Sequence, residues 1–223
     1  MLHARPAVRA GRATPALLGG VTHWAGAPWL AAELRELGIS AAWVPHCWVN
    51  APATLPPLPD ASEPFTVLAY LPEGRAEFYG GEAVLRLARA LPEASVLVVA
   101  AQSLPWACPS NVRCVGWVAD MAPVYARCHV LLRLPRHDGL SFMVQEALAY
   151  GRFAVWSYPF EGALEAKSAD AAIATVRGLA VHHAAGELPL NERGAAHVRE
   201  RYCAARVRAD LLAGFEKVLA GWT

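Results

Sequence analysis

Short apolar runs alternate with amphipathic stretches along most of this chain, from residue 65 onwards. The runs are continuous rather than alternating, as in strands that are buried on both faces of a parallel sheet. The stretches between them repeat apolar residues at helical spacing. Strands that alternate with helices in this way predict an α/β fold with a doubly wound parallel sheet. The expected strands are residues 65–71, 95–101, 111–118, 130–134 and 153–156, and the expected helices are 82–91, 121–127 and 141–150.

The N-terminal part of the chain has a shorter pattern that ends in a proline-rich segment. Residues 16–21 are expected to form a short strand, and residues 39–48 another. Between them, a helix is expected to start at Pro28 and to end at Gly38, because proline suits a first helical turn and glycine a helix end. Several prolines between residues 50 and 64 mark a linker.

The pattern is weaker beyond residue 156. A weaker helix is expected over residues 163–174 and a short edge strand over 179–183. Residues 191–221 are helical in pattern, with a break near Cys203. The pattern as a whole predicts a flexible N-terminus at residues 1–15, a small first segment at 16–50, a linker at 51–64 and a main domain at 65–223.

Composition and charge narrow the classes of function. Hydrophobic residues make up 55% of the 223 residues, which is typical of a globular protein with a large core. The formal net charge is +1, so no excess charge is present to bind a nucleic-acid backbone, and no nucleic-acid partner is expected. No apolar run approaches the roughly 18 residues of a transmembrane helix. The N-terminus lacks the apolar region of a signal peptide, so a cytoplasmic location is expected, with attachment to the inner face of the membrane left open.

The five cysteines stand at irregular spacings and form no Cys-x-x-Cys pair. No histidines accompany them at zinc-finger spacing. Reduced and mostly buried thiols are therefore expected, with no structural metal and no cofactor.

One stretch combines buried structure with charged side chains. The strand at 130–134 leads into a loop with Arg136, His137 and Asp138, and the next helix carries Glu146. A carboxylate on an apolar helix is costly without a partner, which makes Glu146 a functional candidate. The free N–H groups of the first helical turn lie between the two acids and form an anion site. Two carboxylates that can accept hydrogen bonds from hydroxyl groups, with an anion site between them, suit a nucleotide-sugar. The alternative interpretation is an ordinary βαβ unit whose acidic side chains are only solvated.

This stretch resembles a known motif. Asp138, seven residues, and then Glu146 followed by Ala-Leu-Ala-x-Gly is similar to the Glu-x7-Glu signature of retaining GT-B glycosyltransferases of the group 1 type, family four. Aspartate stands in place of the first glutamate, which shortens the reach of that side chain. The resemblance covers residues 65–221, the nucleotide-sugar-binding lobe, and part of 16–50, which is similar to the end of the other lobe.

The resemblance implies roles for individual residues. Glu146 would hold the ribose hydroxyls, Asp138 the donor sugar, and Arg75 the diphosphate. Further donor contacts are implied for Gly74, Arg136, His137, Gly139, Leu140 and Ser141, and for the base-pocket residues Gly116, Trp117 and Val118.

Several residues also have other interpretations. Arg133 follows apolar residues in an expected core strand, so it needs an anion, either Asp138, another acid or a phosphate. Trp117 itself is expected to fill core, although its position suggests the base pocket. Four tryptophans crowd the first segment and suggest either a platform for sugars or, as the commoner case, packing in the core. They are Trp24, Trp29, Trp43 and Trp48.

The resemblance implies retaining transfer of a sugar from a nucleotide-diphosphate donor, without a metal, to an unknown carbohydrate or lipid-linked acceptor in polysaccharide or glycoconjugate synthesis. Basic side chains and the helix N-terminus would stabilise the leaving diphosphate. Two other hypotheses remain: a nucleotide-sugar-binding subunit that needs an acceptor domain from a partner or from self-association, and an inactive lobe.

Overall fold

The computed structural model describes residues 21–220, and these fall into two compact units. Unit 1 consists of the described residues up to Trp48 together with those from Arg201 onwards, and unit 2 is Val49–Glu200. The segment expected to be flexible at residues 1–15, and all but the last residue of the strand expected at 16–21, lie outside the described residues. The division into domains at residues 50 and 64 stays a prediction.

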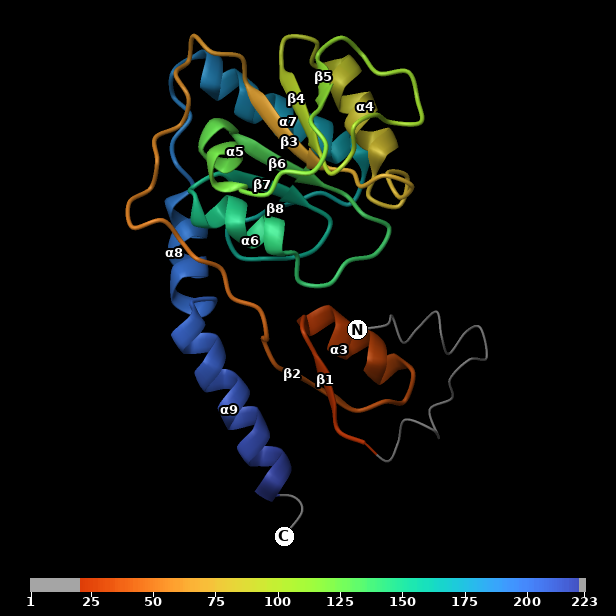
Figure 1. The fold of residues 1–223 in the computed structure, drawn as a ribbon, viewed down its shortest axis with the longest axis vertical. Helices are drawn as coiled ribbons and strands as arrows, with labels where there is room; N and C mark the ends of the chain where they lie inside the picture. Colours follow the sequence, from red (N-terminus) through yellow and green to blue (C-terminus); the bar gives the residue numbers. More distant parts are fainter. Residues whose placement is uncertain (1–20, 221–223) are drawn as a thin grey trace. The chain divides into compact units, whose positions relative to one another are not determined.

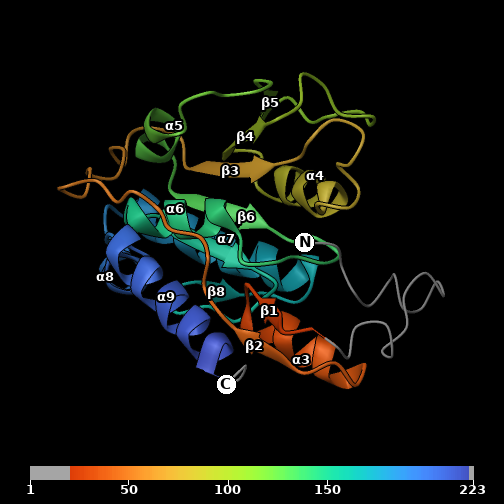
Figure 2. The ribbon, with the colours of Figure 1, turned by 60° about the horizontal axis from the view of Figure 1, so that its bottom comes forward.

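Unit 2 is built on a six-stranded sheet in which every neighbouring pair of strands is parallel. The order across the sheet is β5-β4-β3-β6-β7-β8, and Figure 2 shows β4 and β5 on one side of β3 and β6 on the other. This is the doubly wound arrangement that the apolar runs predict. The strands are β3 (Thr66–Tyr70), β4 (Ser95–Val99), β5 (Val112–Cys114), β6 (Val130–Arg133), β7 (Phe153–Trp156) and β8 (Leu164–Glu165).

Helices cover the sheet (Figure 1). Apolar side chains from the helices and the strands pack together in a hydrophobic core. α4 packs against α7, and together with alternate residues of β3, β4 and β6 they form a hydrophobic core cluster. α6 packs against β6 and β7. The helices of this unit are α4 (Gly81–Ala90), α5 (Ala122–Arg127), α6 (Phe142–Ala149), α7 (Ala169–Ala184) and α8 (Glu192–Arg201), of which only Arg201 belongs to unit 1.

The strand order reverses between β3 and β6. From β3 the chain proceeds to β4 and β5 on one side, and then returns to place β6 on the other side. The loops that leave the carboxyl ends of β3 and β6 therefore run in opposite directions. In open parallel sheets of this kind, ligands bind at such a switch point.

Two expected elements near residue 170 are wrong. The weaker helix at 163–174 and the edge strand at 179–183 are replaced by the short strand β8 and the long helix α7. Ser168 caps this helix by accepting a hydrogen bond from the Ala171 N–H at 3.2 Å. The apolar run at 179–183 belongs to the last turns of α7, because a short run alone does not distinguish a strand from a helix.

Unit 1 is smaller and contains a pair of parallel strands. β1 (His23–Ala25) pairs with β2 (Ala41–Trp43), and α3 (Pro28–Glu36) connects them. The expected helix from Pro28 is confirmed, whereas the strand expected at 39–48 is regular only over β2. α9 (Ala204–Ala220) joins this unit through an edge-on contact of Phe215 with Trp24, with ring centroids 4.8 Å apart. The expected helix break near Cys203 is confirmed.

A buried arginine holds the proline-rich segment against the rest of unit 2. Arg152 is fully buried, and its guanidinium donates hydrogen bonds to the backbone carbonyls of Pro57 at 2.8 Å, Tyr125 at 2.7 Å and Ala126 at 3.1 Å. Burial lowers the pKa of Arg152. Three carbonyl acceptors offset part of the cost of burying the charge, and they fix the segment to α5.

A buried histidine predicts a pH dependence of stability. His129 is fully buried against Phe65 and His183, and its Nδ1 accepts a hydrogen bond from the Thr66 N–H at 2.9 Å. Burial first, and then the charges of His183 and Arg152, lower the pKa of His129 to about 4. The unfolded chain, with a histidine pKa of about 6.5, therefore takes up this proton first as the pH falls.

The contribution of His129 is fully present above about pH 6.5 and is lost as the pH falls towards 4. We expect the free energy of unfolding from urea titrations to drop by about 2–3 kcal/mol over this range because of this group. His129→Gln should flatten that part of the profile. An unchanged profile in this variant would assign the acid sensitivity to other groups.

Candidate functional site

The loop between β6 and α6 is organised by a buried ion pair. Arg133, the last residue of β6, donates from Nε to Asp138 Oδ2 at 2.6 Å and from Nη2 to Asp138 Oδ1 at 3.0 Å. Both side chains are buried, with relative exposures of 8% and 9% for the two residues. The expectation that Arg133 needs an anion is confirmed, and Asp138 is the partner.

Two aromatic residues also hold Asp138. The Trp156 Nε1–H donates to Asp138 Oδ2 at 3.3 Å, and the Asp138 N–H donates to the Tyr158 hydroxyl oxygen at 3.0 Å. His137 stacks edge-on with Tyr158 at 6.4 Å between centroids. Residues of β6, β7 and the loop after β7 therefore fix this acid, and the hydrogen bonds to its carboxylate are charge-assisted.

The N-terminus of α6 follows directly. Ser141 is the N-cap, and its hydroxyl accepts from the Val144 N–H at 3.4 Å. Gly139 and Leu140 are half-buried beside it. The first-turn N–H groups of a helix have no partner within the helix and carry a partial positive charge, so they suit a phosphate.

Glu146 lies on α6, beyond the first turn, and is half-buried. The Tyr125 hydroxyl of α5 donates to its Oε2 at 2.6 Å. Burial, and after it the Glu146 carboxylate, raise the pKa of Tyr125, so that the hydroxyl remains a donor. Within the described residues, no other hydrogen bond to the Glu146 carboxylate occurs, which leaves Oε1 available to an added donor.

The loop after β3 packs against the loop after β6. Gly80 adopts a φ of +83°, and a Cβ there would lie 2.5 Å from the Leu134 carbonyl oxygen, so only glycine permits this approach. The Arg136 N–H donates to the Phe78 carbonyl at 2.8 Å, and the Arg136 side chain forms an ion pair with Glu77. The two loops on either side of the switch point are thus joined.

Arg75 and Gly74 lie in the same loop. Gly74 has a φ of +70°, and no atom lies within 4 Å of the position that a Cβ would take there, so it serves the turn rather than a close approach. The exposed Arg75 guanidinium lies over the Phe78 ring at 5.1 Å and the Tyr79 ring at 5.6 Å. In this structure Arg75 contacts aromatic residues of its own loop.

The carboxyl ends of β4 and β5 lie at the same edge of the sheet as those of β3 and β6. The Ala100 N–H donates to the Gly116 carbonyl at 2.7 Å, and the Gln102 N–H donates to Glu73 Oε1 at 3.3 Å. Gly116 has a φ of +71°, and a Cβ there would collide with the Gln102 side chain. The expectation that Trp117 fills core is wrong, because 79% of this residue is exposed.

The structure therefore brings the candidate residues to one edge of the sheet, in two groups. One group surrounds the joined loops after β3 and β6, and the other lies at the ends of β4 and β5, where Val118 is half-buried beside Trp117. Three supporting residues were not expected from the sequence: Tyr125, Trp156 and Tyr158. The available signal was the rule that a buried tyrosine or tryptophan needs a hydrogen-bond partner.

Residues 21–220 contain neither a ready metal site nor a membrane-spanning helix. In this part of the chain, no group of three or more histidine, cysteine or acidic side chains is placed to hold a metal ion. None of the described helices is long and apolar enough to cross a membrane. The cysteines form no disulfide among the described residues, and Cys47 and Cys128 are the buried ones.

Solved structures share this fold. The Anabaena protein HepE, in complex with UDP-glucose, matches 88% of the chain with a TM-score of 0.67 and 10% identity. Sucrose-phosphate synthase from Thermosynechococcus elongatus matches 93% with a TM-score of 0.73 and 17% identity. The lipopolysaccharide outer core galactosyltransferase WaaB matches 88% with a TM-score of 0.66 and 15% identity. The fold is that of a GT-B glycosyltransferase lobe.

The GT-B likeness covers part of each neighbour. The chain spans 64% of HepE, 61% of the sucrose-phosphate synthase and 62% of WaaB, which is less than two thirds of each. No protein family matches the sequence as a whole or in part, and no curated protein matches it either. The likeness therefore concerns the fold, and it agrees with the resemblance in the Asp138–Glu146 motif.

Proposed function

We propose that unit 2 binds a nucleotide-diphosphate-sugar at the carboxyl ends of β3–β6 and that the chain takes part in retaining transfer of the sugar. The observation that carries this proposal is Glu146. Its carboxylate is fixed by the Tyr125 hydroxyl at 2.6 Å, it lies one turn behind a helix N-terminus, and it retains an oxygen for an added donor. A diol bound to this carboxylate would place a diphosphate near the anion site of α6.

The remaining roles follow from position. The N-terminus of α6 would supply positive charge for the leaving diphosphate. Arg136 would contribute after it leaves Glu77, and Arg75 after it leaves its aromatic contacts. Such preorganised charge stabilises a transition state in which the diphosphate gains negative charge. A leaving phosphate oxygen would accept the proton of the acceptor hydroxyl as the new glycosidic bond forms, so no metal or cofactor is required.

Asp138 has a structural role as the partner of Arg133, and we propose a second role in binding the donor sugar. In the proposed complex it would contact the donor sugar, but both of its oxygens already accept hydrogen bonds from Arg133. A sugar hydroxyl would therefore bind to a carboxylate that is positioned and partly neutralised. Trp117, exposed beside Gly116, would lie next to the nucleobase.

A second function is suggested by the fact that the chain matches only part of the length of each similar structure. The matched structures include GtfA, in complex with UDP and GlcNAc, and the GtfA/B complex, of which the chain spans 43% and 45%. We infer that, if the chain binds a donor but does not transfer the sugar alone, it acts as a nucleotide-sugar-binding subunit. An acceptor domain would then complete the site, because one lobe alone cannot exclude water from the reacting atoms.

Calorimetry with uridine, guanosine and adenosine diphosphates tests donor binding. One of the three is expected to bind at least about tenfold more tightly than its monophosphate, because the second phosphate adds charge-assisted hydrogen bonds. Addition of EDTA should leave the affinity unchanged. Failure of all three to bind would end the proposal, and binding without transfer to any acceptor would favour the subunit.

A further inference from the structure

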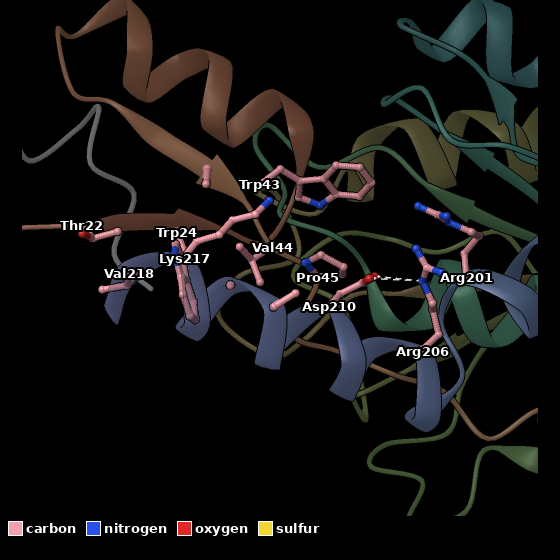
Figure 3. Close-up of a pocket in the computed structure, with 13 residues that line it drawn as sticks. Thr22, Trp24, Trp43, Val44, Pro45, Arg201, Arg206, Asp210, Lys217 and Val218 are labelled. Atoms are coloured by element: carbon pink, nitrogen blue, oxygen red, sulfur yellow. Dashed lines mark hydrogen bonds and ion pairs between the residues drawn. The ribbon is translucent and has the colours of Figure 1, made fainter. Parts of the chain in front are cut away.

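Unit 1 contains a pocket that the donor site does not use. Its volume is about 550 Å³, and it is lined by β1, the end of β2 and α9, with Arg201 at one end. Figure 3 shows the Arg201 and Arg206 guanidinium groups together at one end, with the Lys217 side chain reaching in from the other and the Trp43 ring between them. The volume suits a single small-molecule ligand of the size of one substituted sugar.

The charge of the lining is unbalanced. Arg206 pairs with Asp210, one turn along α9, with its Nε 3.2 Å from Asp210 Oδ1. Arg201 and Lys217 form no ion pair with any residue that the structure describes. Three cations therefore face one carboxylate, in a chain whose total formal charge is only +1. A ligand with two negative charges would balance them.

The aromatic lining is exposed to this space. Trp43 is 40% exposed although it lies on β2, and Trp24 lines the same pocket while its edge is fixed by Phe215. The indole ring offers a flat apolar face, which packs well against the C–H face of a pyranose, and an N–H at its rim. The side chains of Val44 and Pro45 complete an apolar floor.

We propose that this pocket binds an anionic sugar, of the class of the sugar phosphates. The phosphate would lie between the guanidinium groups of Arg201 and Arg206, because each planar guanidinium group can donate two parallel hydrogen bonds to two phosphate oxygens. Lys217 would contact the opposite side, and the sugar ring would lie on Trp43. Asp210 would accept a hydrogen bond from a sugar hydroxyl, which a bare anion does not offer. This inference does not depend on the donor site of unit 2.

Glucose 6-phosphate serves as the probe, with glucose and inorganic phosphate as its two halves, in calorimetric titrations of the full chain. The sugar phosphate is expected to bind at least about tenfold more tightly than either half. Arg201→Ala and Lys217→Ala should each weaken it about tenfold, in line with the loss of one charge-assisted contact. Trp43→Ala should weaken the sugar phosphate and leave phosphate binding unchanged.

Two variants serve as matched controls. Arg208→Ala removes an exposed arginine from α9 outside the pocket, and Trp48→Ala removes a tryptophan that is 49% exposed but does not line it. Both should retain the affinity, and circular dichroism should show that all variants are folded. The proposal is overturned if glucose 6-phosphate does not bind, if phosphate binds equally well, or if the control variants lose as much affinity as the pocket variants. Nucleoside diphosphate binding, measured separately, reports on unit 2.

Discussion

Replacement of Arg133 by methionine is expected to destabilise unit 2 by about 3–5 kcal/mol. The change removes the guanidinium that donates two hydrogen bonds to the buried Asp138 carboxylate, while the hydrogen bond from the Trp156 Nε1–H is kept. A buried carboxylate that loses its cationic partner is destabilising, because neutral hydrogen bonds offset only part of the cost of desolvating the charge. Methionine retains much of the volume between Tyr70 and Tyr79, whose rings lie within 5.6 Å of the Arg133 guanidinium carbon. Urea titration followed by circular dichroism measures the loss.

A double variant separates the ion pair from the packing around it. Arg133→Met combined with Asp138→Asn removes both charges, and the new amide can still accept from Trp156. We expect most of the lost stability to return, because no unpaired charge remains. A single variant that loses less than about 1 kcal/mol would show instead that the pair is screened by water.

The same double variant tests the role proposed for Asp138. If Asp138 only positions the loop, nucleotide binding should persist in the double variant, and so should discrimination between donor sugars. If Asp138 holds the donor sugar, affinity for the nucleoside diphosphate should persist while the added affinity for the nucleotide-sugar disappears. The difference between these two ligands therefore isolates the sugar contact from the stability of the loop.

The sheet could be predicted because its signal is local. Strands such as β3 and β6 are buried on both faces, so they appear as unbroken apolar runs. The parallel arrangement then places their carboxyl ends, and the polar loops that follow, at one edge. The error at residues 163–183 has the same origin, because an apolar run inside α7 looks like a short strand when the helix around it is weakly amphipathic.

The edge of the sheet at which the candidate residues gather could be predicted, but the contacts between their side chains could not. The charges of Arg133 and Asp138 stand five residues apart, so their pairing could be expected. Tyr125 and Glu146 are 21 residues apart on different helices, and Trp156 reaches Asp138 from the next strand. Such contacts depend on how α5 and α6 lie on the sheet, which the hydrophobic pattern does not specify. The exposure of Trp117 likewise depends on the turn at Gly116.

Replacement of Glu146 by alanine is expected to weaken nucleoside diphosphate binding about 100-fold, through the loss of two charge-assisted hydrogen bonds to the ribose. Glu146→Gln should have a smaller effect, because its amide oxygen can still accept from Tyr125 or from one hydroxyl. Glu93→Ala, at an exposed position just after α4, is the matched control and should leave the affinity unchanged. Calorimetry on folded variants measures each affinity.

The ligand can be changed in parallel to show which contact is lost. The 2′-deoxy form of the bound nucleotide should bind the unaltered chain more weakly, because one of the two hydroxyl contacts to Glu146 is missing. In Glu146→Ala the deoxy and ordinary nucleotides should bind equally, since the partner of that hydroxyl has gone. A cycle of the two changes therefore gives a coupling free energy, and a value near zero would contradict the ribose contact. Tyr125→Phe should give an intermediate coupling, because Glu146 then keeps its charge but loses the hydroxyl that positions it.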